Sequence, residues 1–287
     1  METADEIDRD MKAGTPNDDG ARIQRGAYFL ELSLDWIVLR ASENVHHLLR
    51  ESHVTLIDEP FGKFVQAQAL HDLRNLFSRL SGTTGVARAY AVRLTDDNDL
   101  VDIAFQLAGG RVLLEAIPSG GCFGECFGTV AGLISGLSSP RGQALLDGGA
   151  RRMRALTGYD RVTLIYGDRR AESSRGTFAA PSSMADGHPT IIGDASGEGV
   201  PIFPRRSDET SASEALLRSC DGSIADTCAN EGVRASLRLP FSVDGISGEF
   251  RCDHRAPRLP SFELHAAAEL FAQLFAMRLE IDALKAR

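Results

Sequence analysis

The stretch that decides the fold is residues 230–254, NEGVRASLRLPFSVDGISGEFRCDH. Residues 233–243 form a β-rich run with apolar side chains at alternate positions over part of its length. Asp244-Gly245 is a two-residue turn signal, because both positions tolerate a positive φ angle. Residues 246–252 form the return strand. The stretch therefore predicts a β-hairpin.

The composition narrows the class of protein. The 287 residues favour two domains, at roughly 100–200 residues per domain. Asp and Glu outnumber Lys and Arg by 40 to 31, which argues against nucleic acid or an acidic membrane surface as partners, since both require a basic face. No apolar run approaches the roughly 18–20 residues of a membrane span. Residues 1–20 are polar and acidic, without the apolar core of a signal peptide, so we expect a disordered arm and a cytoplasmic protein.

Strands, short helices and then an antiparallel meander predict a first domain of the α+β kind. The expected strands are two within residues 26–39 and one each at 87–94, 100–107 and 111–117, and the expected helices lie at 42–50 and 64–80.

The second half of the sequence predicts more helix than the first half. Residues 129–157 read as helical with an interruption near 138–140, residues 161–166 as a strand, residues 171–206 as a long loop and residues 211–219 as a short helix. Residues 261–287 carry an apolar stripe at helical spacing, with Ser261 as the expected N-cap and Glu263 in the first turn. The stripe either covers only its own sheet or continues over residues 277–284 as a dimer seam.

Three stretches together resemble the paired PAS and GAF domains of bacterial phytochromes. They are residues 69–75 (ALHDLRN), residues 159–162 (YDRV), and residues 230–236 (NEGVRAS) followed by 252–257 (CDHRAP). The last is similar to the family's Asn-Met-Gly-Val-Arg-Ala-Ser strand and its Cys-His-His-x-x-Pro ending. The resemblance covers roughly residues 21–285 and implies an α+β fold of antiparallel sheets with flanking helices. The expected parts are the arm at 1–20, a PAS-like domain at 21–120, a GAF domain at 121–275 and a C-terminal helix extension at 276–287.

The resemblance implies a linear tetrapyrrole, a bilin, in the GAF domain. Bacterial members attach it to a cysteine ahead of an Ile-Gln-Pro-His-Gly motif, but residues 23–26 read IQRG here and no cysteine precedes Cys122. Thioether attachment needs a thiolate, so the sequence predicts no cysteine for the bacterial type of attachment. Ser223 stands at the position where plant-type members carry their cysteine.

Positions that contact the bilin in the family also differ. The resemblance places Ile224 and Asp253 where the family has histidines, and Arg238 where it has a serine facing a propionate. The family's Pro-Ala-Ser-Asp-Ile-Pro segment is not found. Three positions are retained as candidates for binding a ligand or chromophore: Arg218, Ser236 and His254. Arg218 either binds a carboxylate through its fork of N–H groups or is an ordinary surface arginine.

The five cysteines do not predict a disulfide framework, because their number is odd. Cys122 and Cys126 lack the usual metal-site spacing, and their glycine-rich surroundings favour a linker. Cys220, Cys228 and Cys252 are either a redox group or buried small apolar residues. No spacing predicts a metal site, and no motif predicts catalysis.

The sequence therefore predicts a non-catalytic, phytochrome-like signalling protein without covalently bound bilin. We expect it to act through contacts with an unidentified signalling partner and to form a homodimer through its C-terminal helix. Two alternatives stay open. One is a photoreceptor that binds biliverdin noncovalently in the GAF pocket, and the other is a redox or small-ligand sensor.

Overall fold

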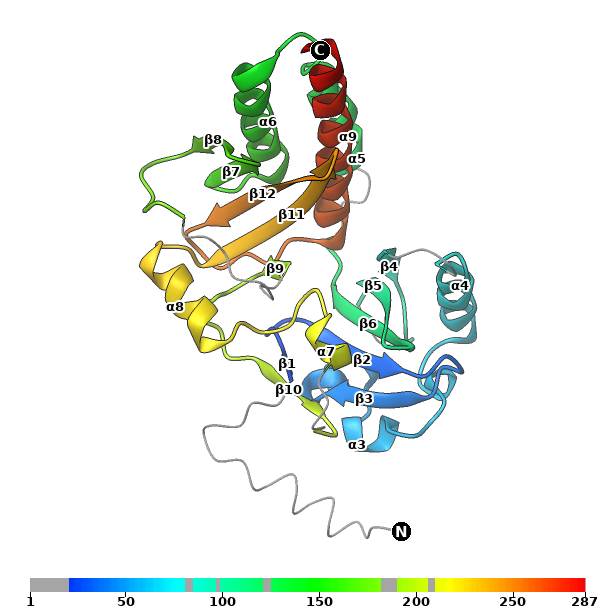
Figure 1. Ribbon diagram of the computed structural model, residues 1–287. Coiled ribbons are helices and arrows are strands. Elements are labelled where there is room, and N and C mark those ends of the chain that lie inside the picture. The colour runs from blue at the N-terminus through cyan, green and yellow to red at the C-terminus, as the bar shows by residue number, and fades with distance from the viewer. Residues whose placement is uncertain are drawn as a thin grey trace.

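The computed structural model describes residues 21–80, 85–96, 99–120, 125–181, 190–205 and 210–286. The predicted arm at residues 1–20 and Cys122 lie outside this part of the chain. The described residues form two antiparallel sheets, one in each of the two lobes seen in Figure 1. No helix among them is long and apolar enough to cross a membrane.

The first sheet has seven strands in the order β1-β10-β3-β2-β6-β5-β4. Its strands are β1 (Arg22–Ile23), β2 (Tyr28–Leu32), β3 (Val38–Ser42), β4 (Ala87–Val92), β5 (Val101–Ala108), β6 (Arg111–Pro118) and β10 (Val200–Phe203). The short segments around it are η1 (Glu43–Val45), α2 (His46–Leu49), α3 (His53–Leu56) and η2 (Phe61–Lys63), followed by the longer α4 (Ala67–Ser78). The predicted meander is confirmed by the pairing of β4 with β5 and of β5 with β6.

The second sheet has five strands in the order β8-β7-β12-β11-β9. Its strands are β7 (Arg161–Tyr166), β8 (Arg169–Ser174), β9 (Ile191–Ile192), β11 (Ala235–Val243) and β12 (Ile246–His254). Its helices are α5 (Glu125–Ser135), α6 (Gly142–Thr157), α8 (Gly222–Asn230) and α9 (Phe262–Ala286), whereas the short α7 (Thr210–Ser213) contacts β6 of the first sheet.

The predicted hairpin is confirmed. β11 and β12 pair along their whole length, from Ala235 opposite His254 to Val243 opposite Ile246. Asp244 and Gly245 form the turn with φ angles of 49° and 78°, as a two-residue hairpin turn requires.

One face of the five-stranded sheet carries the apolar core. Leu237, Leu239, Phe250 and Cys252 alternate along the hairpin and are buried in one cluster with residues of α6 and α9. The ring of Phe250 packs edge-on against Phe275 of α9, with 5.1 Å between ring centroids. The core therefore lies between the sheet and these helices, and the opposite face of the sheet is left for other segments.

The long loop predicted at residues 171–206 is wrong in part, because it contains most of β8 and the short strands β9 and β10. β10 pairs with both β1 and β3, so a segment from the second half of the chain completes the first sheet. Short strands of this kind are stabilised by partners far away in the sequence, which local patterns do not reveal. The helix predicted at 211–219 is also shorter in the structure, where α7 ends at Ser213.

The predicted long helix is confirmed as α9, which runs from the junction of the lobes to the far end of the second lobe (Figure 1). Its N-cap is Ser261, whose Oγ accepts a hydrogen bond of 3.1 Å from the backbone N–H of Leu264. Near its start α9 also contacts the first sheet, since Arg88 of β4 donates to Glu269 at 2.7 Å and lies 2.9 Å from Nδ1 of His265. α9 therefore connects both lobes.

Candidate functional site

The second face of the five-stranded sheet is polar and buried. Strand alternation places Arg161 and Thr163 of β7, Arg251 and Asp253 of β12, and Ser236 of β11 on this face. All five are no more than 2% exposed. Charged groups are rarely buried unless they are paired, so this face has to satisfy them internally.

Two arginines and two carboxylates pair with one another there. Asp253 Oδ2 accepts from Arg161 Nε at 2.9 Å and Nη2 at 2.7 Å, while Asp253 Oδ1 accepts from Arg251 Nε at 2.9 Å and from Ser236 Oγ at 3.0 Å. Glu231 Oε2 accepts from Arg161 Nη2 at 3.3 Å and, at shorter range, from Arg251 Nη2. Each carboxylate thus joins both guanidinium groups. We call Arg161, Glu231, Arg251 and Asp253 the charge network.

The charge network connects the sheet to α8. Glu231 directly follows this helix, whose first turn is capped by Asp221 accepting from the N–H of Ile224 at 2.8 Å. A carboxylate at a helix C-terminus is unfavourable with respect to the helix dipole, and the two guanidinium groups offset this cost for Glu231. Burial alone would lower the pKa of Arg251, but the carboxylates of Asp253 and Glu231 raise it above its usual value.

Residues 175–181 cover the network from the other side. Arg161 Nη1 donates to the carbonyl of Ala179 at 2.6 Å, and the Phe178 ring lies over Arg161 at 4.6 Å and over Arg255 at 3.9 Å. Arg255 also donates to the carbonyl oxygens of Arg175 and Thr177. Arg161 therefore holds this covering segment and α8 against the same face of the sheet.

Apolar residues complete the cover. A small buried cluster separate from the main core joins two residues of α8, Ile224 and Cys228, to Ile192, Ala195 and Val233. Ile224, at the position where the resemblance implies a histidine, contributes to this cluster.

The three ligand-binding candidates do not lie together. Ser236 belongs to the polar face and donates to Asp253. His254 alternates onto the opposite face, where its Nδ1 lies 2.9 Å from Asp160 Oδ2 and its ring meets Tyr159 edge-on at 5.8 Å. Arg218 lies beside the N-terminal strand, where it forms an isolated bridge with Ile23. Their roles as ligand contacts stay a prediction.

The proposed redox cysteines also lie in two different places. Cys252 is buried in the core beneath α6 and α9, whereas Cys228 and Cys220 lie in or beside the apolar cluster under α8. Burial raises the pKa of Cys228 to about 11 and that of Cys220 to about 12. These thiols are protonated at neutral pH, which does not favour redox chemistry.

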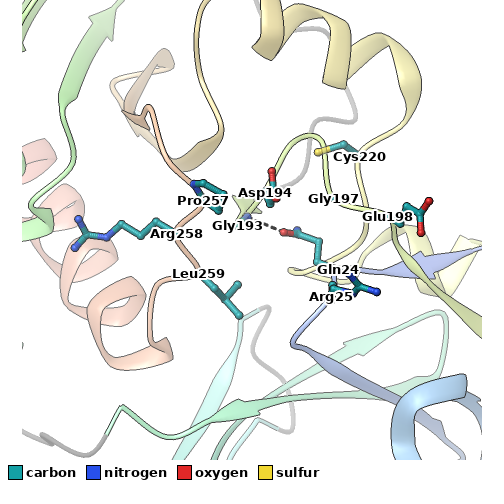
Figure 2. Close-up of a pocket in the computed structure, with 10 residues that line it drawn as sticks. All are labelled: Gln24, Arg25, Gly193, Asp194, Gly197, Glu198, Cys220, Pro257, Arg258 and Leu259. Carbon is teal, nitrogen blue, oxygen red and sulfur yellow. Dashed lines mark hydrogen bonds between the residues drawn. The ribbon is translucent and has the colours of Figure 1, made fainter.

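A cavity of about 310 Å³ lies where the N-terminal segment meets the second lobe (Figure 2). This is near the lower end of the range for small-molecule sites. Its polar lining is largely bonded within the protein. Gln24 bonds to Gly193 N–H, Asp194 pairs with Arg234 at 2.8 Å, and Arg258 points away from the cavity to the carbonyl oxygens of Thr157 and Gly158. Because these polar groups already bond to one another or to the backbone, the cavity is better explained as part of a structural junction than as a ligand site.

The fold, with its two antiparallel sheets and long final helix, matches that of a PAS–GAF chromophore-binding domain of the phytochrome type. The chromophore-binding domain of an unusual bacteriophytochrome from R. palustris, RpBphP3, matches with a TM-score of 0.75 at 22% identity, over 93% of this chain and 97% of that one. The chromophore-binding domain of Stigmatella aurantiaca phytochrome P1 matches with a TM-score of 0.74 at 21% identity, over 92% of this chain and 99% of that one. No protein-family model and no curated protein matches the chain. At these identities the likeness establishes the fold.

The predicted resemblance is thereby confirmed at the level of fold, but the prediction missed the charge network. Arg161, Glu231 and Arg251 were not expected to have a role. One signal was present in the sequence: polar residues at 161 and 163, and again at 249, 251 and 253, alternate with the apolar residues between them. That pattern marks a polar face but does not reveal that a helix buries it.

Proposed function

We propose that this chain is a non-catalytic, cytoplasmic, phytochrome-like signal-transduction module that carries no covalently bound bilin and acts through protein contacts. The observation that carries the proposal is the hydrogen bonding of Asp253. Both of its oxygens already accept hydrogen bonds, four in all, from Arg161, Arg251 and Ser236. No lone pair is left over for a ligand's N–H groups in good geometry.

The residues present do not fit a bilin. A covalent link of the bacterial type requires a cysteine near the N-terminus, and the sequence has none before Cys122. On the polar face, the side chains of Arg161, Arg251, Asp253 and Ser236 bond to one another, and Ile224 supplies an apolar group in the cover.

The outer side of α9 supports a homodimer as part of this proposal. Met277, Ile281 and Leu284 are 60%, 45% and 59% exposed, and Leu270 and Leu274 precede them along the helix. These five apolar residues follow one another at alternating spacings of four and three residues, which is the a/d pattern of a coiled-coil seam. A second copy presenting the same stripe would cover it symmetrically.

One spectrum tests the chromophore part of the proposal. We expect the chain, co-expressed with a biliverdin source, to purify without a red or far-red absorption band. A band that photoconverts would overturn the proposal and support the noncovalent photoreceptor instead.

Light scattering tests the dimer. We expect Ile281→Glu/Leu284→Glu to convert a dimer into a monomer, because two charges would enter the apolar seam. The matched control is Leu34→Glu/Val54→Glu, which changes two similarly exposed apolar residues in the first lobe and is expected to leave the dimer intact. A dimer that survives the α9 variant would place the interface elsewhere.

A further inference from the structure

We infer that the charge network is a lock: it holds α8 and residues 175–181 on the polar face of the five-stranded sheet, so that the module keeps one conformation with no ligand bound. This inference rests on the proposed function and names the residues that close the site. It differs from the loss of an attachment cysteine, which would remove only the covalent link.

Among the residues that the structure describes, the charges of the lock balance. Two guanidinium groups face two carboxylates, and Asp253 and Glu231 each bind both arginines. Removing one partner of such a buried set leaves an uncompensated charge, whereas removing a matched pair leaves a neutral remainder. The four residues therefore act as a unit.

The lock joins three parts of the chain. Arg161 comes from β7, Arg251 and Asp253 come from β12, and Glu231 comes from the end of α8. Through Ala179 and Phe178, Arg161 extends the lock to residues 175–181. A ligand that entered between α8 and the sheet would separate Glu231 from both arginines. The site is therefore closed by ion pairs that a neutral ligand group cannot replace.

Hydrogen exchange of α8 tests the lock. The variant Glu231→Met/Arg251→Met removes one charge of each sign and leaves the Arg161–Asp253 pair in place. We expect the amides of α8 to exchange at least about tenfold faster than in the wild type, because the helix loses its attachment to β12. The matched control is Arg238→Met/Glu249→Met, which removes a neighbouring ion pair between β11 and β12 and is expected to change exchange in α8 by less than about twofold. Unchanged exchange in the first variant would overturn the lock.

Thermal unfolding provides a second test. Arg161→Met alone is expected to lower the Tm more than Arg161→Met/Asp253→Met, because the single change leaves a buried carboxylate charge without a compensating guanidinium group. Equal or larger loss in the double variant would contradict the lock, and the double variant remains measurable if the single variant fails to fold.

The two proposals fail separately. A photoconverting band in the wild type would overturn the proposed function, whatever the exchange data show. Slow exchange in the Glu231→Met/Arg251→Met variant without such a band would overturn the lock alone.

Discussion

Gln24 and Gly193 are joined by a hydrogen bond of 2.6 Å from the backbone N–H of Gly193 to Oε1 of Gln24. Nε2 of the same side chain donates to the carbonyl oxygens of Ile191 at 2.6 Å and Arg218 at 3.0 Å. Gln24 is buried, and its own N–H donates to Leu217. One glutamine therefore fixes the N-terminal segment between two distant parts of the second lobe.

Gln24→Ala is expected to lower the free energy of unfolding by about 3 kcal/mol, because three backbone groups lose their partner and each buried unsatisfied group costs about 1–3 kcal/mol before relaxation. Urea unfolding measures this. Gln68→Ala is the matched control, since the side chain of Gln68 bonds to Asp72 on the exposed side of α4, and it should cost less than about 0.5 kcal/mol. Similar losses in the two variants would show that the junction contributes little.

Glu115 makes a second connection between the lobes. It lies on β6 and accepts from the backbone N–H groups of Leu216 and Leu217 at 2.9 and 2.7 Å. Burial raises its pKa from 4.5 to about 7, although the two hydrogen bonds act in the opposite direction. Between pH 4.5 and about 7, the carboxyl group of Glu115 is therefore protonated in the folded state and ionised in the unfolded state.

Because the folded pKa lies above the unfolded one, Glu115 contributes stability that is present below pH 4.5 and is lost as the pH rises to about 7. The loss amounts to roughly 3 kcal/mol at about 1.4 kcal/mol per pH unit. We expect Glu115→Gln to lack this component. The measurement is the difference in unfolding free energy between wild type and variant, taken at pH 5 and at pH 8. In this difference the contributions of titrating groups that both proteins share, such as His265, cancel. A difference that does not vary with pH would contradict the assignment.

The parts of the fold predicted from sequence are those with local causes. Ser261 caps α9, and Asp244 and Gly245 form the hairpin turn, because these residues act on their own neighbours. β9 and β10 were missed because each is short and is stabilised by pairing with strands far away in the sequence. Interpretation of the site failed for a similar reason. Asp253 was recognised as a departure from the family pattern, but its partner Arg161 is distant in sequence, so the change was read as a loss and not as a new ion pair.

The buried thiols give a prediction about chemical reactivity. At pH 8, a thiol with a pKa of about 11 is only about one part in a thousand thiolate, and burial also raises the pKa of Cys252. We expect alkylation of the native protein, followed by peptide mass spectrometry, to leave Cys228 and Cys252 unlabelled. Labelling after unfolding in urea is the control. Fast labelling of Cys228 in the native state would favour the redox alternative.

Two glycines in neighbouring helices are expected to respond to alanine in opposite directions. A Cβ at Gly149 of α6 would lie 2.5 Å from the ring of Phe275, which is itself fully buried among other aromatic rings. Gly132 of α5 is exposed, and a Cβ there would meet nothing within 4 Å.

Gly149→Ala should therefore destabilise the protein by about 1–2 kcal/mol, because an overpacking cost of about 1–3 kcal/mol exceeds the gain of up to about 1 kcal/mol in helix propensity. Gly132→Ala keeps only that gain and should stabilise the protein by about 0.5–1 kcal/mol. Chemical unfolding of both variants measures the two signs against the wild type. A stabilising Gly149→Ala would mean that Phe275 moves aside at little cost, and that α6 and α9 are packed more loosely against the hairpin than the ring contacts indicate.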